Sequence, residues 1–155
     1  MNIKLPKNQI MTFKAKIVKL CILLIFVLTS RISVLAETTS TFNWQPVIDA
    51  IIEVESNGDA RAKSGNSVGA MQITPILVAE CNNILRSRKQ SKRYKLSDRF
   101  NLKKSKEMFL LMQSQFNQEN NVEQAIRSWN GGNNYSRKRT QRYYEKVMAV
   151  LNSSK

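Results

Sequence analysis

The chain has 155 residues and a formal net charge of +14, from 25 basic and 11 acidic side chains, and it contains no histidine. The absence of histidine excludes Ser-His and Cys-His nucleophilic systems and the common zinc sites. Any acid–base chemistry must therefore use carboxylates, lysine or tyrosine, and we expect neither a metal nor a cofactor.

Residues 1–36 have the composition of a signal peptide. They contain six basic residues and no acid; the basic stretch ends at Lys19, and an uninterrupted apolar run of nine residues follows at 20–28. Nine residues are too few to span a bilayer, which needs about 20. We therefore expect export to the periplasm or the cell envelope, or secretion, with cleavage before Glu37. A true start at Met11 and an uncleaved membrane anchor are the alternatives.

Removal of this segment leaves one small domain. The remaining 119 residues carry 19 basic and 11 acidic side chains, a net charge of +8. We expect a short linker at 37–44, the domain at 45–151 and a tail at 152–155. Cys81 is the one cysteine left in this part, so no intramolecular disulfide can form there, and its position on an apolar stripe favours a buried structural thiol.

The first predicted helix begins near Pro46 and carries an acid on its apolar face. Asp49 and Glu53 share the solvent-facing side. The buried stripe follows the i, i+3, i+4, i+7 spacing through Ile48, Ile51, Ile52 and Glu55. Burial raises the pKa of a carboxyl group, which suits a general acid at neutral pH. The alternative is a helix that ends here, with Glu55 turned to water near Asn57.

Helical periodicity continues along the rest of the chain. A polar loop with glycines is expected from Ser56 to Val68, and Thr74-Pro75 is typical of an N-cap followed by proline in the first helical turn. This signal opens a helix to about Leu85, whose apolar stripe is Leu77, Cys81, Ile84 and Leu85. Residues 86–97 then carry six basic side chains and no acid.

Three more helices complete an all-α domain. The first is expected from about Leu102 to Phe116, with one face made of Ser105, Met108, Phe109, Met112 and Phe116. Asn120 and Glu123 are expected to form a capping pair for a short helix, which Asn130-Gly131-Gly132 ends. The inward face of this helix is expected to carry Val122, Ala125, Ile126 and Trp129. The last helix is expected from about Arg139 to Leu151, burying Tyr143 or Tyr144, Val147 and Leu151.

Four short motifs follow one another along this domain. They are Glu55-Ser56 with Gly69-Ala70-Met71-Gln72-Ile73 and Pro75; Asn101-Leu102 with Ser105; Ser128-Trp129-Asn130-Gly131-Gly132; and Thr140-Gln141-Arg142-Tyr143. Their order and spacing resemble the soluble-type lytic transglycosylases over about residues 45–151. The resemblance implies a mainly helical, lysozyme-like fold with a saccharide-binding groove. It also implies cleavage of the β-1,4 bond between N-acetylmuramic acid and N-acetylglucosamine in peptidoglycan.

The family resemblance assigns the site residues. The resemblance implies that a single glutamate, here Glu55, acts first as the acid and then as the base that closes a 1,6-anhydro ring. Ser56, Gln72 and Asn130 match residues expected near the substrate, and Tyr143 matches the tyrosine expected to hydrogen-bond the catalytic carboxylate. The alternatives are structural: a helix-end cap for Ser56, a helix stop for Asn130 and core packing for Tyr143. Trp129 and Ser105 depart from the family's usual tyrosine and glycine.

Other functions stay open at this point. A hydrolytic lysozyme of the same fold and a non-catalytic wall-binding module are the alternatives to the transglycosylase. Peptidoglycan glycan strands are the expected partner, and by analogy a secretion or conjugation assembly is another. We expect contact with a membrane only through the N-terminal segment. The basic stretch at 86–95 favours a solvated loop over attraction to anionic wall polymers, lipid head groups or acidic stem peptides, and nucleic acid is not expected.

Overall fold

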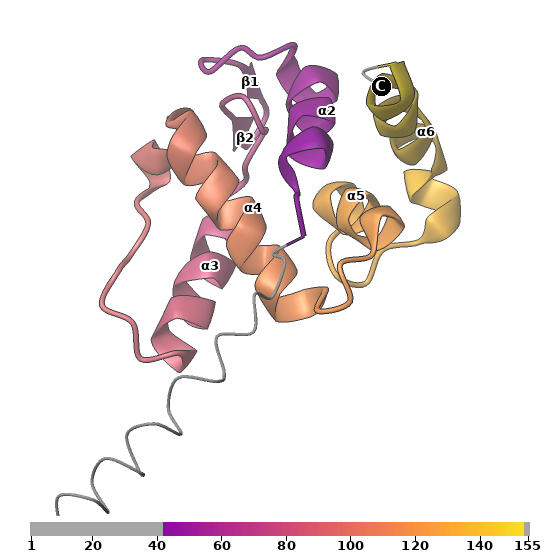
Figure 1. Cartoon of the computed structure of the whole chain (residues 1–155). Coiled ribbons are helices and arrows are strands. Elements are labelled where there is room, and N and C mark those ends of the chain that lie inside the picture. The colour runs from indigo at the N-terminus through magenta and orange to yellow at the C-terminus, as the bar shows by residue number, and fades with distance from the viewer. Residues whose placement is uncertain (1–41, 154–155) are drawn as a thin grey trace, which may run out of the picture. The chain divides into compact units, whose positions relative to one another are not determined.

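The computed structural model describes residues 42–153, which form a mainly helical domain (Figure 1). The predicted signal peptide, most of the linker and the last two residues lie outside this range. In chain order the elements are α2 (Gln45–Ser56), β1 (Lys63–Ser64), β2 (Ser67–Val68), α3 (Pro75–Ser87), the 3₁₀ helix η2 (Leu96–Phe100), α4 (Leu102–Phe116), α5 (Val122–Gly131) and α6 (Arg137–Ser153). The predicted all-α fold class is confirmed.

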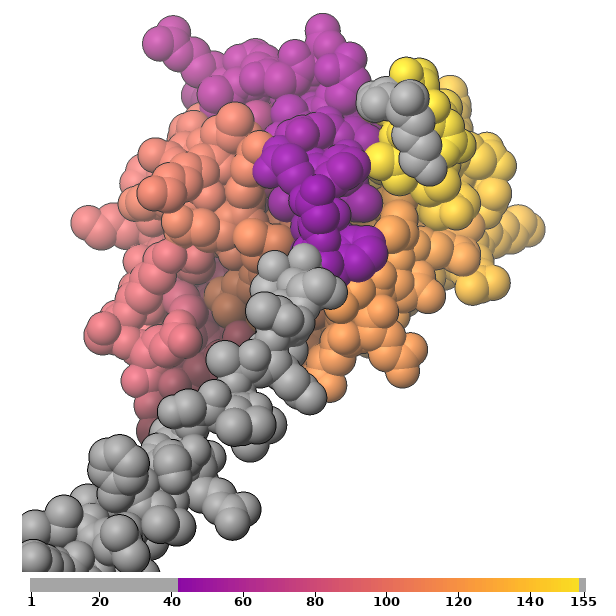
Figure 2. Space-filling model, in the orientation of Figure 1, coloured from indigo at the N-terminus to yellow at the C-terminus, as the bar shows by residue number. Residues whose placement is uncertain are grey.

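The helices pack as two groups: α2 with α5 and α6, and α3 with α4 and η2. Figure 2 shows α2 at the surface between α4 and the C-terminal part of the domain. One face of α2 is therefore exposed, and its other face lies on the core. No helix within residues 42–153 is long and apolar enough to cross a membrane.

Local sequence signals account for where the helices begin. The Thr74 side chain accepts a hydrogen bond from the Leu77 backbone N–H at 3.2 Å, and Pro75 occupies the first helical position of α3. The Asn101 side chain accepts from the Lys104 N–H at 3.0 Å and caps α4. The bounds of α4 match those expected from the sequence.

The core lies beneath the inner face of α2. Helix α2 buries Val47, Ile48, Ala50 and Ile51, whereas Asp49 and Glu53 are exposed, as the periodicity predicts. An aromatic chain continues the core, with ring centroids 5.6 Å apart for Trp44 and Phe109 and 5.3 Å apart for Phe109 and Trp129. Buried residues from the other helices complete it, among them Met71, Ile73, Cys81, Met108, Ile126 and Val147. Cys81 is fully buried, and burial raises the pKa of its thiol to about 12.

Several details of the sequence prediction are wrong. The cap of α5 is Asn121, whose side chain accepts from the Gln124 N–H, whereas Asn120 adopts a left-handed φ of 55° in the preceding turn. Phe116 is exposed at the end of α4. Tyr94, the one aromatic residue of the basic stretch at 86–95, is buried.

The expected loop between α2 and α3 contains an antiparallel hairpin. It pairs Lys63 with Val68 and Ser64 with Ser67, and an isolated bridge joins Val68 to Ile73. Strands of two residues are too short for the alternation of side chains to be read from the sequence. The bridge brings the turn at 69–73 back against the hairpin, close to the end of α2.

Candidate active site

Glu55 lies in the last turn of α2. Asn57 follows with a left-handed φ of 54°, and its backbone N–H donates to the Glu53 carbonyl at 2.9 Å. The Gly58 N–H donates to the Ile52 carbonyl at 3.4 Å, from a φ of 82° that suits glycine. These bonds end the helix directly after Glu55 and Ser56. The Glu55 side chain is half-buried at this helix end, and the alternative of a carboxylate turned fully to water is wrong.

Tyr143 reaches Glu55 from α6. Its hydroxyl donates a hydrogen bond to Oε1 of Glu55 at 2.7 Å, although the two residues are 88 positions apart. The hydrogen bond that the family resemblance implies is therefore present, and the structure distinguishes Tyr143 from Tyr144. Burial raises the pKa of Tyr143 above its ordinary value, and the charge of Glu55 raises it further. Tyr143 consequently stays neutral and keeps the proton that it donates.

Two opposing effects set the pKa of the Glu55 carboxyl group. Burial raises it, and the hydrogen bond from Tyr143 lowers it by stabilising the carboxylate. Burial is the larger effect, so the pKa lies above the ordinary value of 4.5. Glu55 can therefore hold its proton to a higher pH than an exposed glutamate does, while the tyrosine keeps its ionised form accessible.

The acids nearest to Glu55 in sequence do not pair with it. Glu53 lies two residues earlier on the helix, which places it on the opposite, exposed face. Asp59 is exposed in the following loop, where its Oδ1 accepts from the Arg61 backbone N–H at 2.7 Å. Four other acids form ion pairs with basic side chains: Asp49, Asp98, Glu107 and Glu123. Glu55 thus lacks a carboxylate partner from its own part of the chain.

Ser56 and Gln72 connect the end of α2 to the turn at 69–73. The Ser56 hydroxyl donates to the Ala70 carbonyl at 2.9 Å, which fixes the turn against the helix. Gln72 adopts a left-handed φ of 47°, and its side-chain Nε2 and its backbone N–H each donate to the Gly69 carbonyl at 3.0 Å. Ser56 therefore follows Glu55 directly in the chain, and Gln72 lies on the turn that Ser56 holds.

Gly69 is required in this turn by both its conformation and its surroundings. Its φ is 78°, and a Cβ added there would lie 2.0 Å from the backbone oxygen of Arg99. The Arg99 guanidinium donates to the Asn66 carbonyl at 3.0 Å and to the Ile73 carbonyl at 3.2 Å. The glycine of the motif therefore allows a close backbone approach within a turn, and α3 begins only at Pro75. Arg99 was not predicted as a residue of this region, because its role depends on a contact between distant segments.

Asn130 lies apart from this group in its hydrogen bonding. It is exposed in the last turn of α5, and no hydrogen bond joins its side chain to the other four predicted residues within the described part of the chain. Its neighbour Trp129 is half-buried, with its ring tilted against Phe109. The indole is therefore partly engaged in the core, which leaves less of it for stacking on a ligand.

Arg127 is a buried charge that was not predicted from the sequence. It lies on α5 with 3% of its surface exposed. Its Nε donates to Oε1 of Glu123 at 2.7 Å, one helical turn earlier. The i, i+4 spacing of Glu123 and Arg127 was the one sign in the sequence that the two side chains pair, but such pairs are typical of exposed helix faces.

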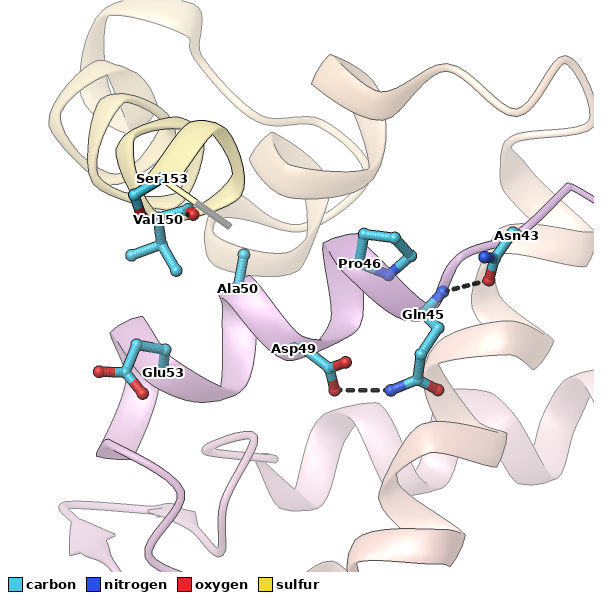
Figure 3. A pocket seen from close by; sticks show the side chains of 8 residues that line it. All are labelled: Asn43, Gln45, Pro46, Asp49, Ala50, Glu53, Val150 and Ser153. Carbon is cyan, nitrogen blue, oxygen red and sulfur yellow. Dashed lines mark hydrogen bonds between the residues drawn. The ribbon is translucent and has the colours of Figure 1, made fainter. Parts of the chain in front are cut away.

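A separate pocket lies along α2 beside the C-terminal end of α6 (Figure 3). It has a volume of about 670 Å³, and Asp49, Glu53 and Val150 are among the residues that line it. Gln45 donates to Asp49 at 2.6 Å across the first turn of the helix. Glu55 is not part of this pocket. The saccharide-binding groove expected beside Glu55 stays a prediction.

The fold and the site define a small, mainly helical domain of the lysozyme-like class, with a tyrosine-bonded glutamic acid as its candidate acid. The chain belongs to the family of the transglycosylase SLT domain, whose family model matches residues 34–151. Comparisons with curated proteins and with solved structures found no match. The resemblance drawn from the sequence motifs is thus confirmed. At the level of the family, membership indicates a lytic-transglycosylase type of activity with peptidoglycan as the substrate.

Proposed function

We propose that this protein is a peptidoglycan lytic transglycosylase that cleaves the β-1,4 bond between N-acetylmuramic acid and N-acetylglucosamine and leaves a 1,6-anhydro end. The observation that carries the proposal is the half-buried Glu55 carboxyl group, whose pKa burial raises and whose Oε1 accepts the hydrogen bond from Tyr143. Such a group can give a proton at neutral pH and take one back.

In the first step, the Glu55 carboxyl group donates its proton to the glycosidic oxygen as the bond from that oxygen to C1 breaks. The glutamate becomes a carboxylate, which the Tyr143 hydroxyl stabilises through the 2.7 Å hydrogen bond. In the second step, this carboxylate takes the proton of the 6-hydroxyl group while O6 bonds to C1. The ring closes, Glu55 is protonated again and no water is consumed.

One carboxylate is sufficient for this chemistry. Most glycosidases use two carboxyl groups, the second acting as a nucleophile or activating a water. Here the attacking hydroxyl belongs to the sugar itself, and its tethering supplies the proximity that a positioned water would otherwise need. The exposed and ion-paired positions of the acids described above agree with a site built on Glu55 alone.

The other predicted residues are proposed to hold the substrate. The Ser56 hydroxyl uses its proton on the Ala70 carbonyl, so its oxygen can accept an N–H from an acetamido group. Gln72 and the exposed amide of Asn130 supply further donors and acceptors for sugar hydroxyls. We also propose export through residues 1–36 to the periplasm or cell envelope, where the substrate lies and where a secretion or conjugation assembly would need the wall opened.

The test is digestion of purified peptidoglycan followed by mass spectrometry of the released fragments. The wild type should release anhydro fragments, which are lighter by one water than the products of hydrolysis, and Glu55→Gln should release none. Glu53→Gln is the matched control, because it removes an exposed acid two residues away on the same helix. Hydrated fragments would identify a lysozyme instead, and no release by the folded wild type would indicate a non-catalytic wall-binding module.

A further inference from the structure

Arg127 connects α5 to the beginning of α6. Its Nη1 donates to the Arg137 carbonyl at 3.0 Å and to the Thr140 Oγ1 at 3.1 Å, and its Nη2 donates to Oε1 of Gln141 at 2.8 Å. The guanidinium also lies 4.3 Å from the ring centroid of Tyr144. Every one of these contacts is made to the first three turns of α6.

A buried guanidinium is stable only where its donors are satisfied and its charge is balanced. Glu123 balances the charge, and it also lies 3.4 Å from Nη2 of Arg137. The planar fork of arginine fixes the direction of each hydrogen bond, which a flexible lysine does not do. The Arg127 contacts therefore hold α6 in one rotation and one height relative to α5.

Tyr143 lies within the segment that Arg127 holds. It follows Gln141 by two residues and precedes Tyr144 by one. Successive side chains leave an α-helix about 100° apart, so Tyr143 points in a different direction from Gln141 and Tyr144. The acceptors on Gln141 and the ring of Tyr144 face α5, while Tyr143 faces Glu55 on α2. A small rotation of α6 about its axis would lengthen the 2.7 Å bond to Glu55, and such a bond weakens steeply with length and angle.

We propose that Arg127 is a positioning residue for the Glu55–Tyr143 pair: by holding the first turns of α6 on α5, it keeps the Tyr143 hydroxyl on the Glu55 carboxyl group. Arg127 acts through the helix and does not itself contact Glu55. Its effect on turnover rests on the proposed function, but its effect on the Glu55–Tyr143 hydrogen bond does not.

The test is a double-mutant cycle that combines Arg127→Lys with Tyr143→Phe. Two quantities are measured on the purified protein: the pKa of Glu55 by ¹³C NMR titration of its carboxyl group, and kcat and KM on peptidoglycan. Arg127→Lys keeps the charge beside Glu123 and loses the fork. It should raise the pKa of Glu55 and lower kcat about tenfold with little change in KM, as expected for one weakened hydrogen bond. In the Tyr143→Phe background it should change neither quantity further.

Two more variants make the result decisive. Gln141→Met removes one exposed acceptor of the Arg127 guanidinium, so it should fold even where Arg127→Lys does not, and it should shift the pKa of Glu55 in the same direction by less. Arg139→Gln is the control, because it removes an exposed cation from the same part of α6 and should leave the pKa of Glu55 unchanged. All measurements are made below the melting temperature of each variant.

Equal effects of Arg127→Lys with and without the Tyr143 hydroxyl would overturn the proposal, as would an unchanged pKa of Glu55 in the folded Arg127→Lys and Gln141→Met proteins. The NMR titration needs no turnover. A wild type that does not cleave peptidoglycan, but whose Glu55 pKa responds to Arg127→Lys only when Tyr143 is present, would refute the proposed function and support the positioning role.

Discussion

Tyr143→Phe removes one hydroxyl group from the hydrogen bond to Glu55 and leaves the ring in place. The bond is 2.7 Å long and partly buried, and its acceptor is charged whenever Glu55 is ionised. A hydrogen bond to a charged group is worth about 1.5–3 kcal/mol, and one pKa unit corresponds to about 1.36 kcal/mol. Because the lost bond stabilised the carboxylate, the pKa of Glu55 should rise by about one to two units.

The same change should slow catalysis. After the first proton transfer the active site contains the Glu55 carboxylate, which the Tyr143 hydroxyl stabilises. Removing about 1.5–3 kcal/mol of this stabilisation should lower kcat about 10-fold to 100-fold. Because the pKa of the acid rises, the pH above which kcat falls should move upward as well.

The assays are the ¹³C NMR titration of the Glu55 carboxyl group and the pH profile of kcat. Tyr144→Phe is the matched control, since it removes the neighbouring hydroxyl and keeps the ring that stacks on Arg127. It should leave the pKa of Glu55 where it is in the wild type. A pKa of Glu55 that stays constant or falls in Tyr143→Phe would refute the assignment of the hydrogen bond as the effect that opposes burial.

Two further predictions concern stability. Because the pKa of Glu55 is raised above 4.5 in the folded state, this group's contribution to the free energy of unfolding is complete below about pH 4.5 and is lost as the pH rises through the folded-state pKa. Glu55→Gln cannot ionise, so urea unfolding of both proteins from pH 4 to 8 should show the stability of wild type falling relative to the variant; a constant difference would contradict this. Gly69→Ala should destabilise by about 3 kcal/mol or more, the sum of a positive φ and overpacking against the Arg99 carbonyl. Gly58→Ala has a similar φ with no atom within 4 Å and should cost about 1–2 kcal/mol, so equal melting temperatures for the two variants would exclude the steric contribution.

The sequence predicts most of the helical framework because local signals specify it. Thr74-Pro75 marks the start of α3 by side-chain capping, and the structure has this cap. The start of α4 at Leu102 follows from the periodicity, and the structure adds the cap at Asn101. The apolar periodicity of α2 correctly places Asp49 and Glu53 outside. Where two candidates are adjacent, local reasoning fails: Asn120 and Asn121 are chemically identical caps, and the turn conformation of Asn120 decides between them.

The site is predicted less completely because its contacts join distant parts of the chain. Glu55 is recognisable as an acid on an apolar stripe, but periodicity leaves Tyr143 and Tyr144 open. The family motif selects Tyr143, and the rotation of α6 is what brings its hydroxyl to Glu55. Arg127 was missed because an arginine on an amphipathic helix is usually exposed, and its contacts to α6 are visible only in the folded structure. The rotation of α6 is itself a property of the packed structure, and Arg127 contributes three hydrogen bonds to α6.

A single carboxyl group that must first give a proton and then take one back cannot be tuned by burial alone. Deeper burial would keep Glu55 protonated but would make the carboxylate formed by the first step costly. The Tyr143 hydroxyl lowers that cost without adding a charge, because burial beside Glu55 raises its own pKa. Glu55 lies at the end of α2, and the helix that packs on α2, α6, also supplies the hydrogen bond. The balance that one-carboxylate chemistry needs is therefore set by the packing of α6 on α2 and α5, and substitutions far from Glu55 should alter its pKa when they move α6.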